Sequence, residues 1–132
     1  MQVYESGEDY LEMILILQNE GREVRSVDIA EAMNVSKASV SVAMKNLREG
    51  GYVTMGEHRV IFLTSVGRRL AETMYERHLL FSDVLSALGV DQDTALNDAC
   101  RIEHAISAES FRALKAYFQE KGVAAEQEDN AD

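Results

Sequence analysis

The sequence contains no proline, a single cysteine and no run of apolar residues long enough to cross a membrane. A transmembrane helix needs about 18 consecutive apolar residues, so we expect no membrane partner. One cysteine excludes an intramolecular disulfide framework and suits the reducing cytoplasm, where we expect the protein to act. The first ten residues lack the basic and then apolar segments of a signal peptide. At 132 residues, the chain has room for one domain or for two small domains that share a core.

Basic residues are also few: 13 lysines and arginines stand against 23 aspartates and glutamates, and the formal net charge is −10. This total at first argues against nucleic acid, but the distribution of charge matters more than the sum. Residues 35–70 include six basic and two acidic residues, a local net charge of +4. Residues 122–132 include four acidic residues and no basic residue, and we expect this acidic tail to be disordered. Positive charge is therefore concentrated in one segment of the chain.

Two short amphipathic helices with a sharp turn between them are predicted from Arg25 to Val53. Asn34 stands at the turn, and asparagine tolerates the left-handed backbone conformation better than most residues. Ser36 can cap the second helix by accepting a backbone N–H bond, and Gly50 is expected to end that helix at the C′ position. This arrangement is typical of a helix-turn-helix that reads DNA through its second helix, although an ordinary helical hairpin is an alternative at this point.

A β-hairpin is predicted directly after this pair of helices. Two β-rich segments, Tyr52–Met55 and His58–Leu63, flank a short turn at Gly56 and Glu57. A helix-turn-helix followed by a hairpin is the order of a winged helix, and the wing tip would lie near the DNA backbone. The candidate DNA-binding residues are the outward-facing Lys37, Ser39, Ser41, Val42 and Lys45, followed by Arg59, Arg68 and Arg69. We expect the three arginines to contact mainly phosphate; a solvated surface is the alternative for each residue.

Further helices are predicted at about 8–19, 64–88, 93–106 and 108–121. Thr64 and Ser65 can cap the second of these helices, Asp91 and Asp93 favour the start of the third, and Ser107 can cap the fourth. The predicted fold class is mainly α, with an N-terminal winged helix-turn-helix followed by an α-helical dimerisation domain. The second part is too thin to form its own core, and a second copy of the chain would cover its exposed aromatic side chains. The predicted domains are a DNA-binding domain over 1–63, a metal-binding and dimerisation domain over 64–121, and the tail over 122–132.

Six side chains that can bind a divalent metal ion lie on three of the predicted helices: Asp9, Glu12, His78, Cys100, Glu103 and His104. Asp9 and Glu12 are three residues apart, so they share one helix face. Cys100 has Glu103 and His104 at i+3 and i+4, which also places the three on one face. Carboxylate, imidazole and thiolate are the ordinary ligands of first-row divalent metals. Taken singly, each residue also has a structural interpretation; a buried cysteine, for example, is often a small core residue.

The chain resembles the diphtheria toxin repressor family over nearly its whole length, to about Lys121. The resemblance rests on the winged helix with Leu63-Thr64-x-x-Gly67 and on three segments: Glu8-Asp9-Tyr10-Leu11-Glu12, Arg77-His78 and Asp98-Ala99-Cys100-Arg101-Ile102-Glu103-His104. Members of the family are metal-activated dimeric transcriptional repressors of iron or manganese uptake. The chain is similar to the short, two-domain form found among the manganese regulators, because longer members add a third, SH3-like domain. The resemblance implies a homodimer that binds double-stranded operator DNA and has no enzymatic activity.

Position by position, the resemblance implies that five residues match metal ligands of the manganese-responsive branch: Asp9, Glu12, His78, Glu103 and His104. The sixth ligand of that branch is a glutamate, and here it is Cys100. The iron-responsive branch has cysteine at this place but methionine in place of Asp9, so the site is a hybrid. Leu96 and Ser82 replace ligands of an ancillary site in the iron branch, so we do not expect that site. A thiolate favours Fe(II), Co(II), Ni(II) or Zn(II), while carboxylates keep Mn(II) possible. We expect Fe(II) or Mn(II), with Co(II), Ni(II) or Zn(II) able to substitute.

Alternative functions remain open from the sequence. One is a metal-independent winged-helix regulator in which Cys100 is a redox sensor, and another is a winged helix that binds protein. A di-metal bundle enzyme or storage protein would need paired Glu-x-x-His elements on two helices, and the sequence has none. There is also no glycine-rich phosphate loop and no nucleophile with an evident base, so we expect no enzyme.

Overall fold

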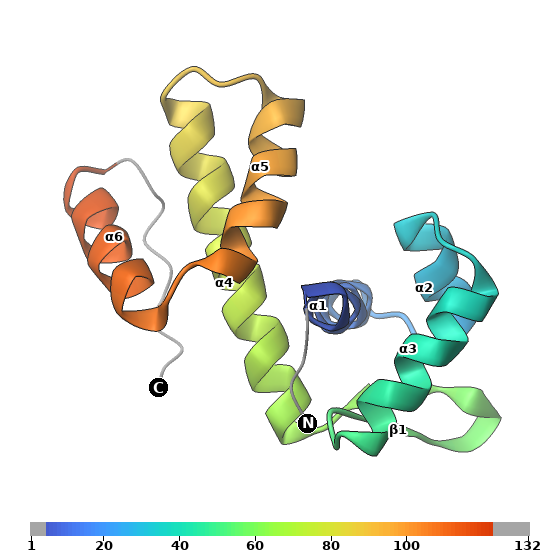
Figure 1. Cartoon of the computed structure of the whole chain (residues 1–132). Helices are drawn as coiled ribbons and strands as arrows, with labels where there is room; N and C mark the ends of the chain where they lie inside the picture. The colour runs from blue at the N-terminus through green and yellow to red at the C-terminus, as the bar shows by residue number, and fades with distance from the viewer. Residues whose placement is uncertain (1–4, 123–132) are drawn as a thin grey trace. The chain divides into compact units, whose positions relative to one another are not determined.

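The computed structural model describes residues 5–122 of the chain (Figure 1). In chain order these residues form α1 (Glu5–Asn19), α2 (Ser26–Met33), α3 (Lys37–Glu49), β1 (Val53–Met55), the 3-10 helix η1 (Glu57–Arg59), β2 (Ile61–Leu63), α4 (Ser65–Ala87), α5 (Gln92–Ala105) and α6 (Ala108–Glu120). The predicted fold class is confirmed: a winged helix-turn-helix is followed by an α-helical domain. None of the described helices has both the length and the apolar character needed to cross a bilayer. Residues 123–132, most of the predicted acidic tail, lie outside the described residues.

The chain divides into two compact units, and the division falls inside α4, between Met74 and Tyr75. The first unit contains α1 to α3, the hairpin and the start of α4; the second contains the rest of α4, α5 and α6. The domain boundary expected from the sequence lies after Leu63, at the end of the hairpin. The structural division lies later in the chain, because it depends on which residues pack together. Because α4 is continuous over 23 residues, it contributes to both units.

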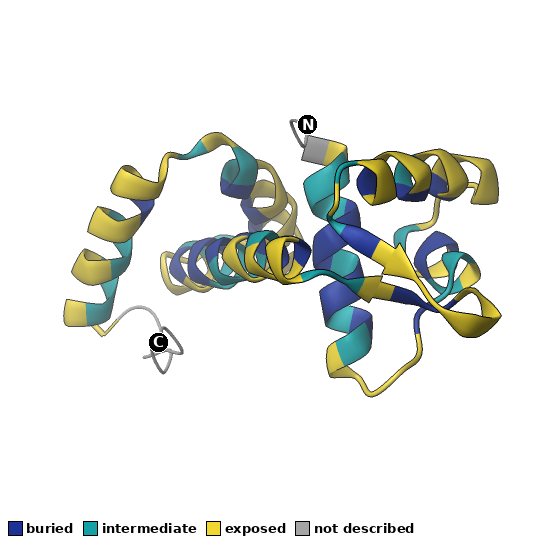
Figure 2. Cartoon of the chain, turned by 90° about the horizontal axis from the view of Figure 1, so that it is seen from below, coloured by how far each residue is buried: buried dark blue, intermediate teal, exposed yellow. Residues whose placement is uncertain are grey.

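Helix α1 is the central helix of the first unit. Its apolar residues cover most of its circumference, and Leu11, Ile14 and Leu15 are almost completely buried. Figure 2 shows the helix that follows the N-terminus mostly in the colours of buried and intermediate residues. It packs against α2, α3 and β2. A helix that is apolar on most sides is stable only when other elements cover it. The helix-turn-helix and the wing therefore share one core built around α1.

The turn between α2 and α3 confirms the predicted roles of two polar residues. Asn34 adopts the left-handed conformation, with φ of 55°. The Ser36 hydroxyl accepts the backbone N–H of Ser39 at 3.1 Å and caps α3. At the other end of α3, the predicted role of Gly50 is wrong. Gly50 keeps a right-handed conformation and donates its N–H to Asn46 O, and Gly51, with φ of 82°, turns the chain instead.

The wing is shorter than predicted. β1 and β2 pair antiparallel, with Val53 opposite Leu63 and Met55 opposite Ile61. The second strand was expected to begin at His58, but residues 57–59 form a tight turn in which the backbone of His58 is not helical. The Gly56 N–H donates to Val60 O at 2.8 Å, so the chain closes a tight loop before the strand can start. The wing tip, residues 56–60, is therefore a compact loop rather than an extension of the sheet.

Thr64 joins the end of α3 to the start of α4. Its hydroxyl accepts the Gly67 N–H at 3.1 Å, which confirms the predicted cap, and donates to Gly51 O at 2.7 Å. The backbone of Gly67 lies against the carbonyl group of Tyr52, and a Cβ at position 67 would overlap that oxygen. The close approach of the Tyr52 backbone thus requires glycine at position 67 of Thr64-x-x-Gly67.

The expectation that the second part is too thin to form its own core is wrong, because buried side chains from α4, α5 and α6 pack together in the second unit. The buried residues of this core are Leu80, Phe81, Val84, Ala99 and Phe111. The rings of Phe81 and Phe111 meet edge to face, with centroids 6.1 Å apart. The Asp91 carboxylate accepts the Asp93 N–H at 3.2 Å and the Ser107 hydroxyl accepts the Ser110 N–H at 3.1 Å. These bonds confirm the predicted starts of α5 and α6.

Candidate metal centre and DNA-binding surface

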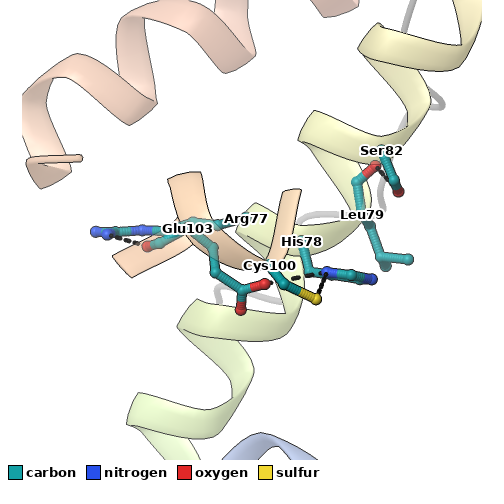
Figure 3. A network of polar contacts seen from close by, with 6 residues as sticks. All are labelled: Arg77, His78, Leu79, Ser82, Cys100 and Glu103. Carbon is teal, nitrogen blue, oxygen red and sulfur yellow. Dashed lines mark hydrogen bonds and ion pairs between the residues drawn. The ribbon is translucent and has the colours of Figure 1, made fainter. Parts of the chain in front are cut away.

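Three side chains that can bind a metal ion meet where α5 runs back alongside the second half of α4 (Figure 1). His78 comes from α4, and Cys100 and Glu103 come from α5. His78 Nδ1 lies 3.0 Å from Glu103 Oε1 and 3.7 Å from Cys100 Sγ. The ligand atoms of the three residues all lie within 4.8 Å of one another. Figure 3 shows that the carboxylate and the sulfur approach the same nitrogen of the histidine ring.

The distances from His78 Nδ1 match those between two ligands of one metal ion. Bonds of about 2.0–2.1 Å to nitrogen or oxygen and about 2.3 Å to sulfur place neighbouring ligand atoms roughly 3–3.7 Å apart. The separations of 3.0 Å and 3.7 Å lie in this range. Imidazole, thiolate and carboxylate together form a donor set that suits several first-row divalent metals. The residues present therefore fit a divalent metal ion.

The three side chains differ in exposure. Glu103 is completely buried, whereas the His78 side chain is 16% exposed and Cys100 lies at the surface. A carboxylate that leaves water loses solvation and is stable only with a charged or hydrogen-bonding partner, which is here the His78 ring. A metal ion could reach the group from the side of Cys100 while Glu103 holds the inner position.

Arg77 holds the end of α5 that carries Glu103. Its guanidinium Nη1 donates to Glu103 O at 3.1 Å and to Ile106 O at 2.8 Å, and its Cζ lies 5.5 Å from the centre of the Phe111 ring. These bonds cap carbonyl groups at the C-terminus of the helix, where positive charge is favoured. The motif itself does not reveal this role. The sequence feature that could have indicated it is the position of Arg77. Helical spacing from Met74 places this charged residue among apolar residues of α4.

The other three predicted ligands are His104 on α5 and Asp9 and Glu12 on α1. His104 follows Glu103 on α5, is half-buried and is not part of the group formed by the described residues. Asp9 is half-buried and Glu12 is buried, and both lie on α1, in the first unit. The role of these three residues as ligands stays a prediction.

The predicted DNA-binding residues are all exposed and all belong to the first unit: Lys37, Ser39, Ser41, Val42, Lys45, Arg59, Arg68 and Arg69. Val42 is 61% exposed although it is apolar, so its side chain is available to a partner. Ser39 is partly committed to the start of α3, because its hydroxyl accepts a bond from the Ser36 hydroxyl at 2.9 Å. Arg68 donates to Gln18 on α1 at 3.2 Å, which fixes one end of its side chain. The exposed face of α3 thus combines positive charge, hydroxyl groups and one apolar side chain.

Two family descriptions match consecutive parts of the chain. Residues 2–60 match "Iron dependent repressor, N-terminal DNA binding domain". Residues 64–123 match "Iron dependent repressor, metal binding and dimerisation domain". The metal-binding description covers the segment in which His78, Cys100 and Glu103 meet.

Similar proteins are found among both sequences and solved structures. "Transcriptional regulator MntR" of Salmonella typhimurium is 38% identical over 119 residues, 90% of this chain and 76% of the relative. The "manganese regulator SloR" superposes with a TM-score of 0.77 at 28% identity, over 90% of this chain and 55% of SloR. A "manganese-dependent transcriptional repressor complex with manganese" has a TM-score of 0.76 at 31% identity, over 86% of this chain and 52% of that structure's chain. The chain therefore spans about half the length of these two solved structures.

Proposed function

Because this chain belongs to the iron-dependent repressor family, we propose that it represses transcription in response to a divalent metal ion. The observation that carries the proposal is the convergence of an imidazole nitrogen, a sulfur and a buried carboxylate oxygen from α4 and α5. The regulated genes would serve iron or manganese homeostasis, and the protein would act in the cytoplasm. We propose no catalytic role for any residue.

The proposed metal ligands are His78, Cys100 and Glu103, with Asp9, Glu12 and His104 as further ligands. A bound divalent ion would supply the positive charge that clustered carboxylates need in order to lie close together. Glu103 would keep its position because Arg77 holds its backbone carbonyl. Ligands from α1 as well as from α4 and α5 would join the helix-turn-helix to the helical domain. The DNA-binding part would then sample fewer orientations and lose less entropy when it binds DNA.

Cys100 is the residue that we expect to influence metal choice. Thiolate sulfur is a soft donor that prefers Fe(II), Co(II), Ni(II) or Zn(II), while the carboxylates accept Mn(II). Solved structures with this fold include proteins described as manganese-dependent, and we propose Fe(II) or Mn(II) for this chain. Co(II), Ni(II) or Zn(II) would substitute for either ion in the same site.

Replacing Cys100 by glutamate is expected to shift metal preference towards Mn(II). We expect the ratio of Mn(II) to Fe(II) affinity to rise about tenfold, because a hard carboxylate replaces a soft thiolate. The measurement is the metal concentration that gives half-maximal DNA binding, determined anaerobically for both ions. Cys100→Ser is the control that removes the sulfur without adding a carboxylate. An unchanged ranking of metals in the glutamate variant would show that Cys100 is not a ligand.

A homodimer on double-stranded DNA is the proposed active form. The second unit exposes large apolar side chains at Leu88, Leu96 and Tyr117, which are 71%, 39% and 53% exposed. Such side chains commonly mark an interaction surface, and a second copy of the chain would satisfy it symmetrically. Two recognition helices, one from each protomer, would enter major grooves separated by about 34 Å or a multiple of that length.

DNA affinity is expected to fall steeply with salt, because lysine and arginine side chains displace counterions from phosphates. Replacing Lys45 by alanine should reduce the slope of log affinity against log salt by about 0.9 per lost contact, or about 1.8 in a dimer. Arg101→Ala is the matched control, because Arg101 is exposed on α5 outside the DNA-binding unit. A slope that Lys45→Ala leaves unchanged would remove Lys45 from the DNA-binding surface.

Fluorescence anisotropy of a palindromic operator probe tests the proposed function. The probe is titrated with the full chain under chelator, Fe(II) and Mn(II) in turn. We expect tight binding only with metal. Equal binding under chelator would contradict metal activation and would support the alternative, a metal-independent regulator with Cys100 as redox sensor.

A further inference from the structure

The wing tip has an unusual backbone that its own residues do not favour. His58 and Arg59 both have positive φ values, 58° and 62°, and neither residue is glycine. A residue with a Cβ in this conformation costs of order 1 kcal/mol or more, so such residues persist only where neighbouring structure holds them. Two in succession require a specific restraint.

The connection between α1 and α2 provides that restraint. Arg25 Nε donates to His58 O at 3.0 Å, and the Ile61 N–H donates to Val24 O at 2.7 Å. Two adjacent residues of the connection, Val24 and Arg25, therefore hold the middle of the tip and the residue that follows the tip. The first bond is the one made by a side chain, so a substitution can remove it without changing the backbone.

Arg25 is itself fixed at the start of α2. Its backbone N–H donates to Asp28 Oδ2 at 2.9 Å, and its carbonyl accepts the Asp28 and Ile29 N–H groups. Asp28 is held in turn by Arg22 Nη2 at 3.0 Å. The Arg25 side chain therefore starts from a rigid helix terminus, which is the requirement for a group that positions another.

We infer that Arg25 is a positioning residue for the wing: it fixes the tip backbone through His58 O and so sets how well Arg59 contacts DNA phosphate. This inference rests on the proposed DNA binding. Arg25 is half-buried and donates its Nε hydrogen to His58 O in the wing, whereas Arg59 is exposed at the tip. Arg25 thus acts on affinity through Arg59 and not through its own charge.

Two variants separate these roles. Arg25→Leu removes the donor and the charge, whereas Arg25→Gln removes the charge but keeps an N–H donor attached to Cδ, where arginine carries Nε. We expect Arg25→Leu to bind DNA about fivefold more weakly, as for the loss of one hydrogen bond, and Arg25→Gln to bind within about twofold of wild type. Arg101→Leu is the matched control, because it removes the same charge from an exposed position on α5, outside the unit that contains the wing.

The probe is a fluorescein-labelled DNA duplex of arbitrary sequence at low salt with excess Mn(II), because phosphate contacts do not require an operator. In an Arg59→Ala background, Arg25→Leu should cause no further loss of affinity. Losses that multiply, or a loss in Arg25→Gln equal to that in Arg25→Leu, would overturn the inference. If Arg25→Leu binds DNA as tightly as the wild type, the inference is overturned but the proposed function is not. If the wild-type chain does not bind the duplex, the proposed function is overturned as well.

Amide hydrogen exchange without DNA gives a second measurement. The N–H groups of Gly56 and Val60 close the wing tip through Val60 O and Glu57 O. We expect both to exchange about fivefold faster in Arg25→Leu, but not in Arg25→Gln or Arg101→Leu. Unchanged exchange in Arg25→Leu would also overturn the inference.

Discussion

Replacing Glu103 by glutamine is expected to lower metal-stimulated DNA affinity by about 100-fold or more. Loss of an outer-shell partner of a metal ligand typically costs 10–100-fold, and Glu103 is proposed as a ligand itself. The substitution keeps the shape of the side chain but removes the negative charge that faces His78 at 3.0 Å. Affinity is measured by anisotropy of the operator probe across a titration of Mn(II) or Fe(II).

The control for this experiment is Asp98→Asn. Asp98 lies on the exposed surface of the same helix, so the variant removes an equal charge away from the proposed ligands. We expect it to respond to metal as the wild type does. The helical circular dichroism of both variants should be unchanged. If Glu103→Gln were activated at the same metal concentration as the wild type, Glu103 could not be a ligand.

The substitution Gly67→Ala is expected to destabilise the first unit by about 3 kcal/mol, the upper end for a group forced into a packed site. The added Cβ would overlap the carbonyl oxygen of Tyr52, which is backbone and cannot rotate away. The same carbonyl accepts the Thr64 N–H at 3.1 Å, so moving it would also weaken the start of α4. The measurement is the free energy of unfolding from urea titration.

Ser65→Ala is the matched control for Gly67→Ala. Ser65 is exposed in the first turn of α4, and alanine adds no atom there. We expect its free energy of unfolding to stay within about 0.5 kcal/mol of wild type. A Gly67→Ala variant as stable as Ser65→Ala would show that the chain at Tyr52 moves without cost.

Local features of this fold follow from the sequence because a few neighbouring residues determine them. Ser36, Asp91 and Ser107 cap their helices through bonds to backbone N–H groups two or three residues ahead. Asn34 makes its turn within the same short range. Such interactions need no information from the rest of the chain, and each prediction is confirmed.

Features that depend on distant contacts were not predicted from sequence. Gly51, and not Gly50, turns the chain after α3, because Thr64 binds the Gly51 carbonyl from 13 residues away. His58 was expected in a strand, but Arg25 holds its carbonyl in the tight tip from 33 residues away. In both cases the local pattern allowed two outcomes and a long-range bond selected one.

The candidate metal site shows the same limit. The spacing of Cys100 and Glu103 is enough to place both on one face of α5. Spacing alone does not show that this face meets His78, 25 residues before Glu103, because that depends on how α5 packs on α4. Only the family resemblance grouped His78 with these two residues. The sequence also gives no role to Arg77, whose partners are carbonyl groups at the far end of α5. The proposed set of six ligands rests on the family resemblance for the remaining three residues.

A Co(II) titration followed by absorption and by DNA binding tests the central claim most directly. Sulfur bonded to Co(II) gives a near-ultraviolet charge-transfer band, so the band reports Cys100 as a ligand, and operator anisotropy is recorded on the same samples. We predict that band and anisotropy rise together in the wild type, that Cys100→Ser loses the band, and that Glu103→Gln needs far more metal for either signal. DNA binding that is complete before any metal is added, or that rises without the sulfur band, would contradict the account.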